Sequence, residues 1–343
     1  MQEITRWRAW VGSRVAVRYR LSTPDPSTGA TLTDVLGDLV AVHDAGLLQV
    51  RTRSGTVDVP LAAVVAGKPV PPRAIRPAPP HLAVSVTDLV AVMARHWNPA
   101  DDARLGGWWL RAAGGFTNRG NSVVPLGPPG VPDDEAEAFV RRFYTDRGLA
   151  ATASIAAPAP GGVPDDAGPA GPAGALLRAH GWQPVKDGSA VVLVAALGGL
   201  RAAADLPAGL ELRSADRPDL GWLATYRYRG QELPAHAVEL LLSAPEQSFW
   251  SVLDGERTVA VARGSCGDGW AGVSCVEVDP GYRRRGLARV LLAAVARWAW
   301  ERGAASCYLQ TAESNRPGQR LYLSAGFVPH HRYDYLRAPA RFR

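Results

Sequence analysis

A basic, glycine-containing stretch late in the chain has the residue types and the spacing of an anion-binding site. A strand-like run, Val276-Glu277-Val278, leads through Asp279-Pro280 into Arg283-Arg284-Arg285-Gly286-Leu287-Ala288. The small residues Gly286 and Ala288 would let a ligand approach the backbone closely. Residues 283–288 would also present successive N–H groups at the positive end of a helix dipole. By itself the stretch leaves open an ordinary helix start with an exposed arginine cluster.

A second pattern follows the first along the chain and consists of Asn315, Tyr322 and the pair Gly326-Phe327. The two patterns together resemble the GNAT superfamily of N-acetyltransferases over roughly residues 211–337. That superfamily has an R/Q-x-x-G-x-G/A loop, here Arg283-x-x-Gly286-x-Ala288, after a V-x-V-x-P lead-in at Val276, Val278 and Pro280. Two patterns in this order, with a strand between them, make the resemblance far more specific than either pattern does.

The resemblance implies acetyl-CoA (coenzyme A) as the cofactor and assigns roles to the matching residues. The pantetheine arm would lie between two splayed strands and bond to the backbone of Val276 to Val278, as an added strand does. A backbone N–H there would polarise the thioester oxygen. Asn315 would reach the pantetheine, and Tyr322 would donate a proton to the leaving thiolate, with a core aromatic as the alternative for Tyr322. The phosphates would lie on the loop, that is, on Arg283, Arg284, Arg285, Gly286, Leu287 and Ala288.

The general base that would deprotonate the amine is left open by the sequence. Several members of the superfamily have a glutamate where this chain has Gly272, and another group has one where Gln310 stands. Glu277 lies on the relevant strand and is a candidate base, although alternation with its neighbours allows it to face away. Glu313 and a water relay are the other candidates.

The patterning predicts the elements that would position these residues. Strands are predicted over 209–213, 270–278, 306–311 and 327–336, with a hairpin over 249–253 and 258–263. Helices are predicted over 218–229, 234–243, 286–302 and 317–325; the third carries an apolar stripe and ends at Gly303. We expect an α/β (α+β) GNAT fold, with a mixed central sheet, splayed strands and flanking helices.

The chain is expected to have three parts and a linker. Short strands over residues 1–70 predict a small all-β, SH3-like barrel, and the proline-rich residues 71–81 predict a linker. Residues 209–340 would form the catalytic GNAT domain. Residues 82–200 would form a degenerate GNAT-like lobe, because Leu177-x-x-x-Gly181-Trp182 repeats Tyr322-x-x-x-Gly326-Phe327 without a phosphate loop. Within this lobe a loose loop is predicted over 156–175. The layout resembles tandem GNAT proteins with one active copy, including an actinobacterial group with an N-terminal barrel.

Two adjacent histidines, His330 and His331, lie in the last predicted strand. Alternation predicts that their side chains point to opposite faces, which argues against joint metal ligation. No metal site is expected elsewhere either, since the three cysteines lack CxxC spacing.

Composition limits the class of protein. The 343 residues include 47% hydrophobic and 20% charged residues, which excludes a wholly disordered or fibrous chain. The net charge of +6 comes almost entirely from arginine and is explained by the codon bias of a GC-rich genome. Without a Lys/Arg block it does not favour a nucleic-acid partner. No apolar run reaches the ~18 residues of a membrane span. We expect no membrane association, a reduced cytoplasmic setting and no oligomer that the sequence supports.

The sequence therefore predicts an acetyl-CoA-dependent N-acetyltransferase that acts on a primary amine of a small molecule or peptide by direct attack in a ternary complex. Two alternatives stay open. One is a non-catalytic acyl-CoA sensor that recruits a partner, and the other is a protein acetyltransferase guided by the N-terminal barrel.

Overall fold

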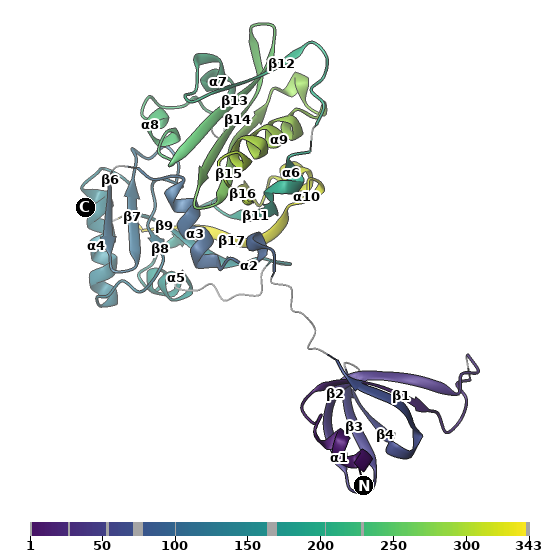
Figure 1. The fold of residues 1–343 in the computed structure, drawn as a ribbon. Helices are drawn as coiled ribbons and strands as arrows, with labels where there is room; N and C mark the ends of the chain where they lie inside the picture. The colour runs from purple at the N-terminus through teal and green to yellow at the C-terminus, as the bar shows by residue number, and fades with distance from the viewer. Residues whose placement is uncertain are drawn as a thin grey trace. The chain divides into compact units, whose positions relative to one another are not determined.

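The structure, a computed structural model, describes residues 2–26, 28–52, 55–70, 78–99, 101–162, 170–202, 204–227 and 230–340. The chain forms two compact units, residues 1–77 and residues 78–343 (Figure 1). Most of the predicted linker, residues 71–77, lies outside the described residues. No helix in the described ranges is both long and apolar enough to cross a membrane.

The first unit is an antiparallel sheet of five strands in the order β4-β3-β2-β1-β5 around one apolar core. In β1, Val15 and Val17 are fully buried while the residues between and beside them are not, as a strand with one core face requires. Trp7 reaches the core from the first helix and packs on Gly67. The expected all-β unit is confirmed. Its elements are α1 (Gln2–Arg8), β1 (Arg14–Arg20), β2 (Leu32–His43), β3 (Leu47–Thr52), β4 (Gly55–Pro60), the short 3-10 helix η1 (Leu61–Ala63) and β5 (Val64–Pro69).

A mixed sheet of nine strands forms the centre of the second unit. Eight of them follow the order β10-β17-β11-β16-β15-β14-β13-β12, and the ninth, β9, also pairs with β17. A separate sheet has the order β6-β7-β8. The predicted mixed central sheet is confirmed. The strands are β6 (Asp101–Leu105), β7 (Trp108–Ala112), β8 (Val124–Pro125), β9 (Thr152–Pro158), β10 (Gln183–Pro184), β11 (Ala190–Ala196), β12 (Leu210–Ala215), β13 (Glu246–Asp254), β14 (Arg257–Gly267), β15 (Trp270–Val278), β16 (Ser306–Ala312) and β17 (Val328–Arg337).

Helices cover both faces of the main sheet. The apolar stripe of α9 packs on Ala260 and Ala262 of β14, whereas Val261, between them, packs with α7 and α8 on the opposite face. This division follows from the two-residue period of a strand. The helices are α2 (Pro80–Ala83), α3 (Val86–Arg95), α4 (Asp133–Thr145), α5 (Ala170–Ala179), α6 (Leu197–Leu200), α7 (Leu220–Thr225), α8 (Ala237–Leu241), the 3-10 helix η2 (Pro280–Tyr282), α9 (Leu287–Trp300) and α10 (Arg316–Ser324).

The two halves of this unit exchange strands. In each half a strand, a helix and a second strand follow one another: β9, α5 and β11 in the first half, and β16, α10 and β17 in the second. Strand β11 pairs with β16 of the other half, β17 pairs with β9 of the other half, and β11 and β17 pair with each other (Figure 1). The sheet is therefore continuous across the lobes predicted at 82–200 and 209–340.

The internal repeat has a structural basis in the way its two helices end. After α5 the amide of Gly181 donates to Arg178 and that of Trp182 donates to Leu177; after α10 the amides of Gly326 and Phe327 bond to Leu323 and Tyr322 in the same pattern. Both ends are Schellman caps, which need a left-handed residue, and both glycines have positive φ. Each cap turns an aromatic side chain inward, and Trp182 and Phe327 are both buried.

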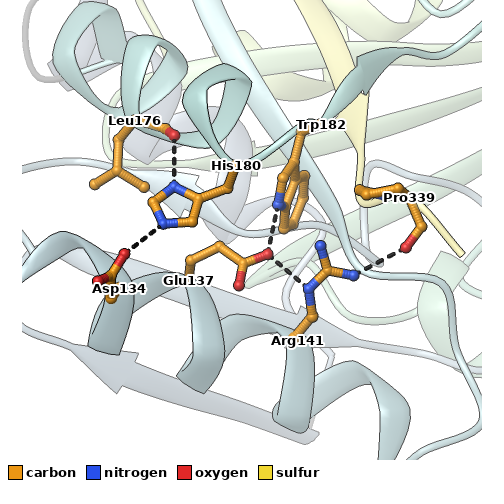
Figure 2. Close-up of polar contacts among 7 residues, drawn as sticks. All are labelled: Asp134, Glu137, Arg141, Leu176, His180, Trp182 and Pro339. Atoms are coloured by element: carbon orange, nitrogen blue, oxygen red, sulfur yellow. Dashed lines mark hydrogen bonds and ion pairs between the residues drawn. The ribbon is translucent and has the colours of Figure 1, made fainter. Parts of the chain in front are cut away.

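Polar contacts hold the first of these aromatic residues in place (Figure 2). The Trp182 indole N–H donates to Glu137 at 2.9 Å, and Arg141 donates to the same carboxylate at 2.6 Å and to the carbonyl of Pro339 at 2.9 Å. His180 bonds through one ring nitrogen to the Leu176 carbonyl and through the other to Asp134. The contacts tie α4 and α5 to the chain that follows β17.

Three local predictions are wrong. The predicted loop over 156–175 overlaps the end of β9 and the start of α5, and only residues 163–169 lie outside the described ranges. The helices predicted over 218–229 and 234–243 are the shorter α7 and α8. His330 and His331 do not point apart: their Nδ1 atoms are 2.8 Å from each other. The pairing of β17 with β11 shifts register at this point, and such a bulge breaks the alternation of side chains.

Candidate active site

Strands β15 and β16 run together at one end and separate at the other. Their parallel pairing starts at Trp270 with Ser306 and stops at Val273 with Leu309, although β15 continues to Val278. A bulge against β14 accompanies the separation and gives Cys275 a φ of +55°. On the side facing β16, the backbone of residues 276–278 has no strand partner among the described residues. An extended ligand could pair with this edge.

A cavity of about 400 Å³ lies where the strands separate. It brings together candidates that are up to 46 positions apart in the chain: Val276, Glu277, Asn315 and Tyr322. It is also lined by side chains that reasoning from the sequence did not single out for the site, including Arg119, Tyr226 and Tyr333. Val278 and the loop 283–288 do not line this cavity. They follow Glu277, which does, within the next eleven positions of the chain.

The loop before α9 has an unusual backbone. Arg284 and Gly286 have φ of +63° and +84°, and Gly286 is the N-cap of α9. The backbone N–H groups of residues 284–288 have no hydrogen-bond acceptor among the described residues. The arginine side chains at 283, 284 and 285 are exposed. Consecutive unpartnered amides in left-handed and helical conformations form an anion-binding concavity, so the loop fits a diphosphate.

Tyr322 lies on α10 and is partly buried, with its ring 5.9 Å from that of Phe327 in an edge-on contact. Burial raises the pKa of the Tyr322 phenol to about 12, and the positive charge of Arg119 opposes that shift only in part. The hydroxyl has no hydrogen-bond partner among the described residues. Tyr322 is therefore a protonated phenol in a cavity wall, with its proton available to a bound group.

Asn315 and Glu277 are the other polar candidates in the cavity. Asn315 caps α10: its Oδ1 accepts from the Gly318 amide at 3.0 Å and its Nδ2 donates to Thr311 at 3.1 Å. The sequence predicted a ligand contact for Asn315, and the structure adds this capping role. Half-burial raises the pKa of the Glu277 carboxyl, although Arg283, 3.5 Å away, lowers it. Glu277 is among the residues that line the cavity, and its carboxylate pairs with Arg283.

The resemblance to the superfamily places a base at Gly272 or at Gln310. In this chain, neighbouring side chains fill the space beside Gly272 and bond to Gln310. At Gly272 a Cβ would lie 2.5 Å from the Ser265 hydroxyl and 2.6 Å from that of Tyr308. Gln310 accepts from Arg119 at 2.6 Å and from the Tyr333 hydroxyl at 3.0 Å. Glu313 does not line the cavity and pairs with Arg332 at 3.6 Å. Of the two candidate glutamates, Glu277 lines the cavity and Glu313 does not.

Comparison with known families places this geometry in context. Residues 85–336 match the family model described as "Probable histone acetyltransferase Rv0428c C-terminal". The chain belongs to this family. Residues 9–68 match the "Rv0428c N-terminal Sm-like domain", so the SH3-like description predicted for the first unit is corrected to Sm-like.

Three individual proteins are also similar to this chain. An "Uncharacterized N-acetyltransferase YobR" of Bacillus subtilis is 24% identical over 251 residues, 71% of this chain and 94% of the relative. A GCN5-related N-acetyltransferase from Kribbella flavida has the same fold, with a TM-score of 0.54, 19% identity and coverage of 74% and 95% of the two chains. A tandem GNAT protein from the clavulanic acid biosynthesis pathway has a TM-score of 0.53, 16% identity and coverage of 77% and 91%. The predicted acyltransferase class and tandem GNAT organisation are confirmed.

Reasoning from the sequence missed the residues that the first half contributes to the site. Arg119 bonds to Gln310 across 191 positions of the chain, and no local pattern around Arg119 indicates this. Arg227 lines the cavity, whereas residues 228 and 229 lie outside the described ranges.

Proposed function

We propose that this protein is an acetyl-CoA-dependent N-acetyltransferase that transfers an acetyl group directly to a primary amine in a ternary complex. The observation that carries the proposal is a run of five backbone amides, residues 284–288, that have no partner among the described residues, next to a strand edge, 276–278, that is likewise unpaired among them and borders the cavity lined by Tyr322. Acetyl-CoA, when bound, supplies an activated thioester. The loop amides would hold its diphosphate, and the edge of residues 276–278 would orient its pantetheine arm.

The chain's own residues supply the proton transfers. Tyr322 holds a proton in the cavity and would give it to the thiolate that leaves as the acetyl group passes to the amine nitrogen. The proton that the amine loses would pass to Glu277, whose raised pKa makes it a stronger base, or to water. A covalent enzyme intermediate is not expected, because burial raises the pKa of the Cys275 and Cys307 thiols and keeps them protonated.

The loop is tested by replacing the residue that gives it its shape. A side chain at Gly286 would have to adopt φ of +84°, which costs an L-residue about 1–2 kcal/mol. We expect Gly286→Val to weaken coenzyme A binding by about 10-fold or more in calorimetry. Gly303→Val is the matched control, because Gly303 has φ of +81° and open surroundings at the other end of α9.

The transfer itself is tested by thiol release from acetyl-CoA in the presence of amines. Amine-dependent release supports the enzyme. If the full chain shows no affinity for coenzyme A, the proposal is wrong. Binding without turnover on a broad amine panel would favour an acyl-CoA sensor instead.

A further inference from the structure

Three arginines contact Trp97, two through its ring and one through its backbone, beside the cavity that contains Tyr322. The guanidinium carbons of Arg263 and Arg119 lie 4.6 Å and 5.8 Å from the centre of its ring, and Arg111 donates to its backbone carbonyl at 3.3 Å. Arg263 is fully buried and Arg111 is 3% exposed. The three come from different elements, β14, the loop after β7, and β7 itself, so the fold concentrates positive charge here.

Two of these arginines have no acidic partner. Arg263 donates to the carbonyls of Leu241 and His96 at 2.7 Å and 3.1 Å, and to a serine hydroxyl. Arg111 donates to two carbonyls and a hydroxyl, each at 3.3 Å. No described carboxylate forms an ion pair with either of them, and the buried Nε of Arg111 has no hydrogen-bond partner. Buried cations are normally paired, because desolvating a charge is costly.

The cationic cluster borders a small space next to the large cavity. Arg111 and Arg119 line a cavity of about 30 Å³ together with Trp97, and no acidic residue lines it. One water molecule needs about 10–15 Å³ on this scale, so the space suits a group the size of a carboxylate. Arg119, Gln310 and Tyr333 line both this space and the cavity that contains Tyr322. The two spaces therefore adjoin at these three residues, and an anion bound at Arg119 would have Tyr322 in the adjoining cavity.

We propose that the acceptor is a small primary amine that carries a carboxylate, of the amino-acid type, with the carboxylate held by Arg119 and Arg111 and the amine directed to the reaction cavity. This inference rests on the proposed function. A guanidinium matches a carboxylate with two parallel hydrogen bonds, and the anion would supply the negative charge that Arg111 and Arg263 lack among the described residues.

The same charges bear on two other features of the site. A lysine-rich histone tail would bring more positive charge to this region, so electrostatics disfavour it as the acceptor. Nearby cations also favour the neutral form of an amine. We therefore expect the arginines to ease deprotonation of the acceptor, which fits a site without a carboxylate at Gly272 or Gln310.

The test compares matched amines on the full chain. Glycine, β-alanine and 4-aminobutyrate are each paired with their carboxamide, and a lysine-rich histone-tail peptide is included. Thiol release gives kcat and KM, and calorimetry gives the affinity of the same compounds with and without coenzyme A. We expect at least one acid to exceed its amide by about 10- to 100-fold in kcat/KM or affinity, the range of a charged hydrogen bond. The peptide should be the poorest acceptor.

Variants locate the effect. Arg119→Gln should raise KM for the preferred acid by about 10-fold or more and bring the ratio of acid to amide in kcat/KM close to one, while Arg119→Lys should recover part of the preference. Arg178→Gln, on an exposed residue of α5, is the matched control. Acids and amides that bind and react equally, or a preference for the peptide, would overturn the inference while acetyl-CoA binding upholds the proposed function. Absence of acetyl-CoA binding would instead defeat the proposed function, and calorimetry of the acids alone would still test the arginine site.

Discussion

The strand exchange predicts which fragments of this protein can fold on their own. Strand β11 comes from the first half but lies between β16 and β17 of the second. Its side chains Val192, Leu193 and Val194 are 0–2% exposed. Burial of such side chains stabilises a protein by about 1.5–3 kcal/mol each, so removing β11 forfeits about 5–9 kcal/mol. That is comparable with the whole stability of a typical domain, about 5–15 kcal/mol.

We therefore expect the fragment 204–343, which contains the complete GNAT motif, to be unfolded or aggregated on its own. The assay is circular dichroism with thermal unfolding, together with size-exclusion chromatography. Co-expression with the fragment 78–202 should restore a compact complex, because β11 then becomes available in trans. The matched control is the fragment 78–343, which is cut at the boundary between the two compact units and should unfold cooperatively. A cooperative transition of 204–343 alone, at a temperature close to that of 78–343, would refute the reasoning.

Three further perturbations address single residues. Tyr322→Phe should lower kcat by about 10²–10⁴-fold, the range for loss of a general acid, while the affinity for coenzyme A stays unchanged in calorimetry. Because burial raises the pKa of the Tyr322 phenol to about 12, ionisation of Tyr322 should not lower the wild-type rate below about pH 11. His180 has its pKa raised by the carbonyl of Leu176 and by Asp134, so its contribution to stability is full below its usual pKa and is lost as pH rises through the higher folded value. Stability from pH 6 to 9 should therefore decline slightly, by under about 1 kcal/mol, and His180→Gln should flatten the decline in denaturant titrations. Gly67→Ala should destabilise the first unit by about 1–3 kcal/mol, because a Cβ would lie 2.1 Å from the Trp7 ring, whereas Gly199→Ala, in open surroundings, should not.

The parts of the fold that local patterns determine could be predicted well. The predicted strand over 270–278 has the bounds of β15, and the helix predicted over 286–302 contains α9. Both have a strong apolar pattern and a clear end signal. The helices α7 and α8 are much shorter than predicted, because the pattern there continues past the packed turns. Strand β9 was not predicted, because prolines and glycines follow it and because its partner, β17, lies more than 170 positions later in the chain.

The candidate site divides in the same way. The phosphate loop and Tyr322 could be found because their signals are short and contiguous. The bulge that brings His330 against His331 depends on the register of β17 with β11, which no pattern within 330–335 encodes. The arginine cluster brings β7 and the loop after it together with β14, which is distant in sequence, and isolated arginines in an arginine-rich chain give no signal.

The first half of this unit contributes to the cavity of the second half, although it has no phosphate-loop motif of its own. The turn before β11, Asp187–Ser189, lines the reaction cavity together with Arg119, so both the acceptor side and the sheet of the active half depend on the first half. A free GNAT lobe would have its strand edge at β16 exposed and no arginine beside Gln310. Since the same exchange that completes the sheet also places Arg119 at the cavity, a change that loosens β11 should reduce acceptor affinity before it reduces coenzyme A affinity. Val192→Ala, measured at a temperature where the chain stays folded, would show this order as a larger rise in KM for the amine than in Kd for coenzyme A.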